Sequence, residues 1–144
     1  MERKTNWIAI VVAAVAAMVI GFLWYGPLFS KPWMAAYGFT MDEANQKLFK
    51  DGVELPMDMT PMIFNTLAMF VFAFLMNWLT GRAGANTWAE GAKIGAIVGI
   101  FVGATRCLGL LFAAEPGSLL PIEGLYPVVQ LSVMGAILGG WKKK

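Results

Sequence analysis

The sequence predicts an all-α membrane protein, a four-transmembrane-helix bundle with a short amphipathic helix in the first outer loop. The first observation is composition: of 144 residues, 58% are hydrophobic and 14% are charged, whereas soluble domains average about 45–50% and about 25%. The second is pattern, because four separate apolar segments of roughly 20 residues or more follow one another, each long enough to cross a hydrocarbon core of about 30 Å. The chain is therefore predicted to form a single membrane domain over residues 1–144.

The first transmembrane helix is predicted over residues 7–26, a segment without any charged residue. A cleaved signal peptide is the alternative interpretation, because Arg3 and Lys4 precede the segment. The segment is longer than the apolar part of a typical signal peptide, and it ends in the bulky pair Trp24 and Tyr25 instead of small residues. We therefore expect a helix that stays in the membrane.

Three further transmembrane helices are predicted over residues 61–80, 88–113 and 122–141. Pro61 suits the first turn of the second helix, since a proline at that position removes no helical hydrogen bond. Gly81 follows the same helix, as glycine commonly does where a helix ends.

The distribution of positive charge predicts how the bundle is oriented. Four spans place both termini on one side of the membrane, and cytoplasmic segments carry the excess of Lys and Arg. The termini and second loop contain Arg3, Lys4, Arg82, Lys93, Lys142, Lys143 and Lys144, whereas the first and third loops contain Lys31, Lys47 and Lys50. Both termini are therefore predicted to be cytoplasmic, and residues 28–60 are predicted to form an outer loop.

The outer loop is too long to be a simple connection. Within it, Thr40 and Glu43 have the spacing of a helix capping box. Met41 and Leu48 would then share one stripe of the helix that follows. We expect this segment to form the short amphipathic helix, lying on the outer membrane interface.

Aromatic residues cluster near the predicted helix ends. Tryptophan and tyrosine are enriched at both membrane interfaces, where they anchor a protein in the bilayer. We expect such an aromatic belt, and no binding site, from Trp7, Trp24, Tyr25, Trp33, Tyr37, Trp78 and Trp88.

Small residues recur at every fourth position on three of the predicted helices. In a membrane, this spacing lets helix backbones approach closely, because packing replaces the hydrophobic drive that lipid does not supply. These faces are predicted to pack against one another. They contain Gly91, Gly95, Gly99 and Gly103 on the third helix, Ala9, Ala13, Ala17 and Gly21 on the first, and Gly135 and Gly139 on the last.

A polar cluster is predicted around Arg106, the only charged residue deep inside a predicted span. Counted at 1.5 Å per residue, it lies at about the depth of Asn65. Glu123 enters from the same side as its candidate counter-ion, and Tyr126 and Gln130 follow on that helix. An unpaired arginine would cost from about 2.5 kcal/mol upward here. The cluster is interpreted either as a structural clamp or as a site or gate for a polar solute.

The last predicted helix has two faces that require contact with protein. At 100° per residue, Gln130 lies about 140–180° away from Gly135 and Gly139. One face would pack within the bundle. We expect a homo-oligomer, or another membrane-protein subunit, to supply the second contact.

Several kinds of chemistry are not predicted. The sequence has no histidine, the commonest metal ligand and acid–base catalyst. Its one cysteine, Cys107, allows no internal disulfide. No nucleophile–base pair, phosphate loop or metal cluster of recognised spacing is present. We therefore expect no enzyme activity, no catalytic residues and no cofactor, and the short run Lys142–Lys144 indicates no nucleic-acid partner.

Three motifs carry a resemblance to a known family: N-W-I-A-I over residues 6–10, W-Y-G-P over 24–27 and M-G-A-I-L-G over 134–139. With these motifs, the chain resembles a widespread bacterial family of small four-helix membrane proteins catalogued as a domain of unknown function. The resemblance covers nearly the whole chain. It implies a multi-pass protein of the bacterial inner (plasma) membrane, and it supplies no catalytic residues.

Three functions are compatible with these features. The sequence favours a non-enzymatic helix-packing module, acting as an accessory subunit or small homo-oligomer whose partners are the lipid bilayer and other helices. The first alternative is a transporter or channel for ions or small solutes, with its polar site around Arg106. The second is Cu(I) handling by Met57, Met59 and Met62, because thioethers are soft ligands, although methionine also serves as a flexible apolar filler.

Overall fold

The computed structural model of the protein describes residues 4–141. In this part of the chain, four helices are long and apolar enough to cross a membrane. They are α1 (Trp7–Leu23) with the π-helical segment η1 (Trp24–Leu28), α3 (Thr60–Arg82), α4 (Trp88–Phe112) and α5 (Leu119–Gly140). The predicted all-α fold class is confirmed, and the protein has the architecture of a multi-pass membrane protein.

Local sequence explains where these helices begin. Asn6 precedes α1, and its side-chain oxygen accepts a hydrogen bond from the Ala9 N–H at 3.1 Å. Thr87 and Glu90 form a capping box at the start of α4, in which each side chain bonds the other's backbone N–H at 3.2 Å. Each cap satisfies backbone donors that the first helical turn leaves without partners.

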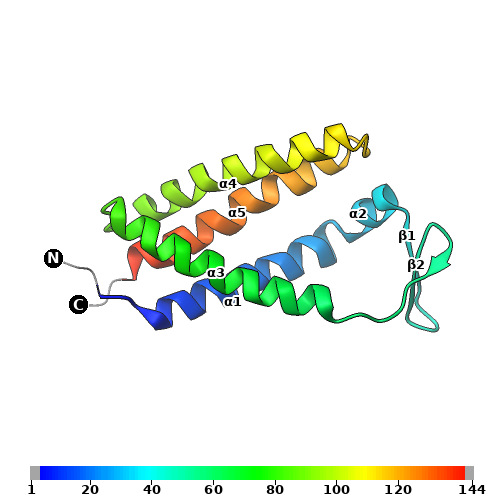
Figure 1. Ribbon diagram of the computed structural model, residues 1–144, viewed down its shortest axis with the longest axis horizontal. Helices are drawn as coiled ribbons and strands as arrows, with labels where there is room; N and C mark the ends of the chain where they lie inside the picture. The colour runs from blue at the N-terminus through cyan, green and yellow to red at the C-terminus, as the bar shows by residue number, and fades with distance from the viewer. Residues whose placement is uncertain (1–3, 142–144) are drawn as a thin grey trace.

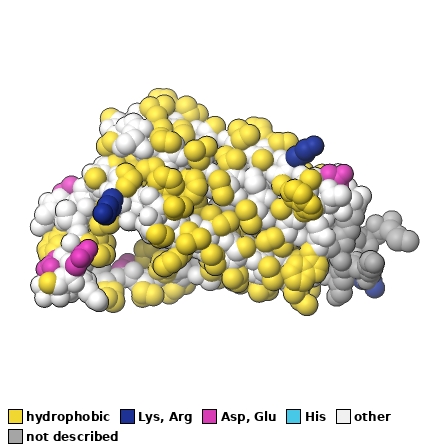
Figure 2. All heavy atoms as spheres, turned by 180° about the vertical axis from the view of Figure 1, so that it is seen from behind, with side chains coloured by type: hydrophobic (Ala, Val, Ile, Leu, Met, Phe, Trp, Pro, Cys, Tyr) yellow, Lys and Arg dark blue, Asp and Glu magenta, His cyan; other side chains and the backbone are white. Residues whose placement is uncertain are grey.

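The two ends of the bundle differ. At one end, which we call the terminal end, α1 begins and α5 ends (Figure 1), and Asn6 Nδ2 donates to the Trp141 carbonyl at 3.3 Å. The opposite end, the loop end, holds the long first loop. Hydrophobic side chains cover the middle of the face in Figure 2, and the charged side chains visible there lie toward the two ends. Of the charges used to predict orientation, Arg3 and Lys142–Lys144 lie outside the described residues.

The first loop contains a short helix, but not where the sequence predicted one. Helix α2 spans Ser30–Tyr37 and ends at Gly38, whose φ of 74° is left-handed. A three-stranded antiparallel sheet follows, in the order β1-β2-β3. Its strands are β1 (Phe39–Asp42), β2 (Lys47–Lys50) and β3 (Val53–Glu54).

The prediction of a helix after Thr40 is wrong because a turn competes with it. The Asp42 carboxylate accepts hydrogen bonds from the Ala44 N–H at 3.1 Å and from Asn45 Nδ2 at 2.8 Å. Gln46 then takes a left-handed φ of 53°. Asp and Asn commonly build such turns. Thr40 instead pairs with Phe49 across the sheet, a combination of residue types that favours strands.

Helix α5 lies at the centre of the bundle. Helix α4 packs along one side of it, and α1 and α3 pack on its other side (Figure 1). The core between α1, α3 and α5 contains Ala9, Ala13, Ala17, Met69, Ala73, Met76, Leu131, Met134 and Leu138. The second face of α5, which we expected another subunit to cover, is thus covered by helices of the same chain.

Candidate functional site

The contact between α4 and α5 is made by backbone against backbone. A Cβ atom at Gly91 would overlap the Gly135 carbonyl, and one at Gly95 would overlap the Leu131 carbonyl. At Gly99, it would lie 2.5 Å from the Val128 Cα atom. A side chain larger than hydrogen therefore does not fit at these three positions of α4. All six glycines predicted for packing on these helices lie in it: Gly91, Gly95, Gly99, Gly103, Gly135 and Gly139.

The small residues of α1 pack elsewhere. Ala13 and Ala17 are fully buried in the core with α3 and α5. A Cβ atom at Gly21 would lie 2.8 Å from the Tyr126 hydroxyl oxygen of α5. The small face of α1 therefore meets α5 and α3, not the glycines of α4.

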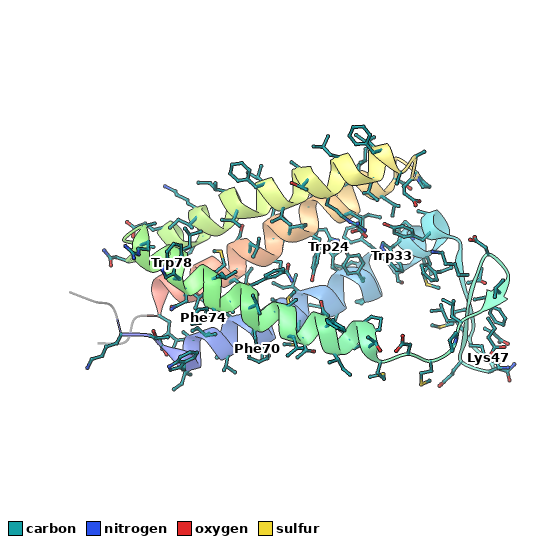
Figure 3. All side chains as sticks on the ribbon, in the orientation of Figure 1. Trp24, Trp33, Lys47, Phe70, Phe74 and Trp78 are labelled. Atoms are coloured by element: carbon teal, nitrogen blue, oxygen red, sulfur yellow. The ribbon has the colours of Figure 1, made fainter. Side chains whose placement is uncertain are left out.

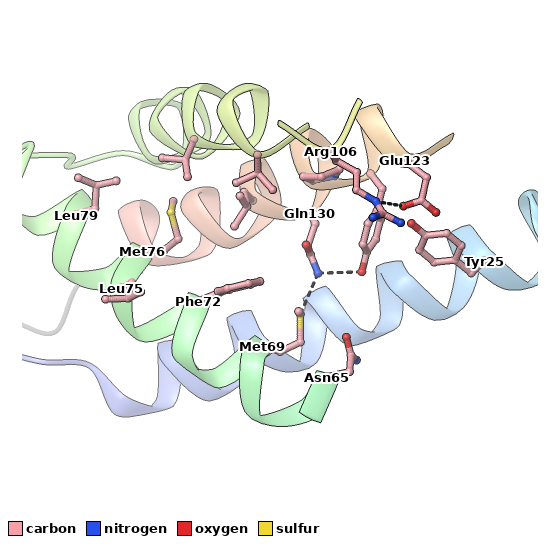
Figure 4. A pocket seen from close by; sticks show the side chains of 15 residues that line it. Tyr25, Asn65, Met69, Phe72, Leu75, Met76, Leu79, Arg106, Glu123 and Gln130 are labelled. Atoms are coloured by element: carbon pink, nitrogen blue, oxygen red, sulfur yellow. Dashed lines mark hydrogen bonds and ion pairs between the residues drawn. The ribbon is translucent and has the colours of Figure 1, made fainter. Parts of the chain in front are cut away.

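A groove separates α3 from α4. These two helices scarcely contact each other, although both pack on α5. The groove has a cavity volume of about 580 Å³ (Figure 4). Its walls are mainly apolar and include Phe72, Leu75 and Leu79 of α3, Val98 and Val102 of α4, and Leu131 of α5.

An ion pair lies at the loop end of this groove. Arg106 Nε of α4 is 3.0 Å from Glu123 Oε2 of α5, so the pair expected from the sequence is present. The other carboxylate oxygen, Oε1, accepts a hydrogen bond from Trp33 Nε1 at 2.7 Å. Arg106 Nη2 donates to the Tyr37 hydroxyl at 3.1 Å, and the Tyr25 hydroxyl points toward Glu123 (Figure 4).

The chain turns back over the bundle to bring Trp33 and Tyr37 to this pair. Gly26, which precedes Pro27, has non-helical backbone angles (φ −100°, ψ −105°) within η1 and redirects the chain into α2. The Trp33 ring then stacks on Phe39 with centroids 5.2 Å apart. The hydrogen bond from Trp33 to Glu123 thus connects α2 to the start of α5, and the stack on Phe39 fixes the Trp33 ring between α2 and β1.

Four residues that we assigned to an interfacial belt instead point toward partners in the protein, and one of them is Tyr25, which points toward Glu123 (Figure 4). Trp24 Nε1 donates to the Ile122 carbonyl at 3.0 Å, and Trp33 and Tyr37 bond the ion pair. Figure 3 shows Trp24 and Trp33 between α5 and the chain segment η1–α2. A buried indole N–H needs an acceptor. Glu123, near the start of the last predicted span, was the sequence signal for such an acceptor.

The pKa of Tyr37 supports its role as an acceptor. Burial raises the pKa of this phenol above its usual value, and the nearby Glu123 carboxylate raises it further. The Arg106 charge acts in the opposite direction but does not offset these effects. Tyr37 is therefore neutral near pH 7 and uses an oxygen lone pair to accept from the guanidinium.

Gln130 and Tyr126, which the sequence placed in the polar cluster, form a second, deeper group. Gln130 Nε2 donates to the Tyr126 hydroxyl and to Met69 Sδ, both at 2.9 Å. Asn65 lines the opposite wall of the groove, on α3, and is exposed. All five residues of the predicted cluster line this cavity, but the hydrogen bonds among them do not form a single network.

The methionines considered for copper lie on the connection between the sheet and α3. Met57 and Met59 precede the helix and Met62 lies in its first turn. All three are exposed, Met57 by 93%. Within residues 4–141, no group of three or more His, Cys, Asp or Glu is placed to hold a metal ion. Copper binding stays a prediction.

Comparison with known proteins identifies the family. The chain matches the family described as "Protein of unknown function (DUF1761)" over residues 8–139, and it belongs to that family. The match includes all four long helices and the outer loop, which confirms the resemblance noted from the sequence motifs. No curated protein and no solved structure matches the chain.

Proposed function

We propose that this member of the DUF1761 family is a non-enzymatic integral membrane protein whose groove between α3 and α4 binds the hydrocarbon chain of a lipid-like amphiphile. The observation that carries the proposal is the groove, with its cavity volume of about 580 Å³, apolar walls and one charged end. Pockets of roughly 300–1,000 Å³ with a few well-placed polar groups are typical of small-molecule sites.

The groove is open sideways, toward the lipid from which such a molecule would arrive. Because α3 and α4 scarcely contact each other, the opening lies between two helices that are long enough to cross the membrane. In a bilayer, that opening faces lipid. A molecule dissolved in the bilayer would therefore enter sideways without passing through water.

The length of the groove suits an extended hydrocarbon chain. Asn65 and Leu79, which both line it, are 14 positions apart on α3, or about 21 Å at 1.5 Å per residue. The groove therefore follows a large part of a hydrocarbon core of about 30 Å.

The helix-packing role favoured by the sequence is less well supported. The small residues that suit close helix contact pack against other helices of the same chain. An accessory subunit or homo-oligomer would have to use outward faces that carry large side chains such as Ile100 and Phe101. Such faces suit lipid contact equally well. Binding in the groove needs no further partner.

A transporter role is also less well supported than binding. The charged groups lie at the loop end of the groove, and the walls toward the terminal end are formed by Leu75, Leu79 and Val98. An ion that left the polar end would lose its hydration without gaining ligands. Apolar walls favour a hydrocarbon chain there.

The orientation in the bacterial inner membrane follows from the charge count made on the sequence. With seven Lys and Arg residues at the termini and second loop against three in the outer loops, the termini are cytoplasmic and Arg106 lies in the outer half of the bundle. In a Cys107→Ser background, an impermeant thiol reagent added outside should label Asn45→Cys and miss Lys143→Cys. The reverse pattern would contradict this orientation.

The groove is tested by filling it. The purified protein in mild detergent is titrated with a pyrene-labelled fatty alcohol, and binding is followed by fluorescence anisotropy. Val102→Trp places a large ring in the groove and should weaken binding at least about tenfold, or about 1.4 kcal/mol. Ile100→Trp, on the outward face of the same helix, should bind like the wild type.

Two results would overturn the proposal. One is the absence of saturable binding to the wild-type protein. The other is equal binding by Val102→Trp and Ile100→Trp when both variants retain the wild-type unfolding temperature. Leu75→Trp fills the groove from the α3 wall and gives an independent second test, with the outward Val71→Trp as its control.

A further inference from the structure

The two charges at the loop end of the groove are not equally accessible. The Glu123 side chain is 10% exposed, whereas that of Arg106 is 52% exposed. Both carboxylate oxygens of Glu123 already accept hydrogen bonds, one from Arg106 and one from Trp33. The charge that a molecule in the groove would meet is therefore the positive charge of the guanidinium.

Arg106 also has donors left for a ligand. A guanidinium carries five N–H groups. Among the described residues, Nε bonds Glu123 and one Nη2 hydrogen bonds Tyr37, which leaves three N–H groups. Asn65 lines the opposite wall of the groove, on α3 (Figure 4), and adds amide donors. Unused donors on both walls favour a ligand group that is rich in acceptors.

We infer that Arg106 binds the head group of the amphiphile, and that this head group is an oxyanion, either a carboxylate or a phosphate. This inference rests on the proposed function and adds the chemistry of the head. A guanidinium forms paired N–H···O bonds with such groups, and charge-assisted bonds are about twice as strong as neutral ones. The hydrocarbon chain then lies toward the terminal end, between the apolar walls.

The depth of Arg106 restricts the size of the head group. Arg106 is six positions from Phe112, the last residue of α4, or about 9 Å along the helix axis. The head group is therefore drawn below the membrane surface. A carboxylate or a phosphate monoester fits this position better than a large polar head, which would have to leave the aqueous interface.

Glu123 acts as a positioning residue. By bonding Nε, it fixes the plane of the guanidinium and leaves Nη1 and part of Nη2 for the ligand. It also offsets the arginine charge. Glu123→Gln keeps one acceptor oxygen, for either the Arg106 or the Trp33 donor, and replaces the second acceptor with an NH2 donor. It also removes the negative charge, so the affinity for an anion should rise. A purely structural clamp would not show this effect.

The test compares ligands that share a 16-carbon chain and differ in the head. Palmitate, hexadecyl phosphate, hexadecanol and hexadecylammonium compete, below their micellar concentrations, with the pyrene-labelled fatty alcohol. For the wild-type protein, we expect both anions to compete about tenfold better than the alcohol. The ammonium compound should be the weakest. Inorganic phosphate alone should not displace the probe, because it lacks the chain.

Variants then assign the preference to Arg106. Arg106→Gln should abolish the preference for the anions over the alcohol, because the guanidinium is removed and the Glu123 carboxylate remains. Glu123→Gln should increase the preference for anions several-fold. The double variant Arg106→Gln/Glu123→Gln leaves no buried charge unpaired, so it provides the same comparison if Arg106→Gln alone does not fold. Lys93→Gln, at the terminal end of the same helix, is the matched control and should keep the wild-type preference.

The outcomes separate this inference from the proposed function. If alcohol and anions compete equally in the wild type, or if the preference persists in both Arg106 variants, the head-group assignment is wrong and the groove still binds the chain. If neither probe nor competitor binds, the proposed function fails as well. Displacement of the probe by inorganic phosphate would identify a free anion as the ligand. A dimer that binds no probe would identify a second copy of the chain as the occupant of the groove. Either result overturns the inference.

Discussion

Helix α4 has two neighbours in the bundle and meets them in opposite ways. Toward α5, its glycines allow the backbones to touch from Gly91 to Gly103, along about three turns. Toward α3, its Val98, Val102 and Arg106 face an open groove. Lipid supplies no hydrophobic drive between helices, so they approach where small residues permit backbone contact. The spacing of glycine on α4 therefore determines which neighbouring helix makes backbone contact with it, and on which side a cavity remains.

The largest effect should come from disrupting the glycine contact between α4 and α5. Gly99→Leu must move Val128 and Pro127 of α5, whose backbone atoms lie 2.5–2.9 Å from a Cβ atom built at Gly99. We expect it to lower the free energy of unfolding by about 3 kcal/mol or more. The outward control Ile97→Leu should change it by less than about 0.5 kcal/mol. Unfolding in detergent checks both, and similar stabilities would refute the assignment of faces.

The second effect concerns the ion pair between Arg106 and Glu123 at the loop end of the groove. Because Arg106 is half exposed, we expect Arg106→Gln or Glu123→Gln each to cost about 1–2 kcal/mol, less than the 3–5 kcal/mol typical of a fully buried pair. The double variant should cost less than the sum by at least about 0.5 kcal/mol. A double-mutant cycle without coupling would show that the pair does not stabilise the fold.

The third effect is at the aromatic cluster that holds α2. Trp33→Phe keeps a ring to stack on Phe39 but loses the hydrogen bond to Glu123. We expect a loss of about 1–1.5 kcal/mol, measured by unfolding in detergent. Trp88→Phe is the matched control, since Trp88 is mainly exposed at the terminal end. A loss as large in the control would mean that ring size, not the hydrogen bond, matters.

The smallest effect is local and lies outside the membrane. The Asn45 amide, with the Ala44 N–H, holds the pKa of Asp42 below its usual value of 3.8. The charged form therefore stabilises the β1–β2 turn above that pH, and the stabilisation is lost as the pH falls through the lowered pKa. The Ala44 amide resonance should titrate below pH 3.8, and not at all in Asp42→Asn. A midpoint above 3.8 would contradict the turn geometry.

The same comparison explains what the sequence could and could not predict. The four spans and the glycine interface follow from periodicity along single helices, and the Arg106–Glu123 pair follows from counting depth. The sheet could not be predicted, because the turn made by Asp42 and Asn45 competes with a helix-capping pattern that is equally plausible from the sequence. The groove could not be predicted either, because it exists where α3 and α4 do not contact each other. That property depends on how α4 and α3 arrange around α5, which no single helix encodes.

The most direct test of the groove is to locate a hydrocarbon chain in it. The protein in liposomes is irradiated with a palmitate that carries a diazirine in its chain, and the labelled residues are identified by mass spectrometry. We expect labelling of Val98, Val102 and Leu75, and its loss when unlabelled palmitate is added in excess. Labelling spread evenly over outward residues such as Ile100 and Val71, and unaffected by unlabelled palmitate, would contradict the account.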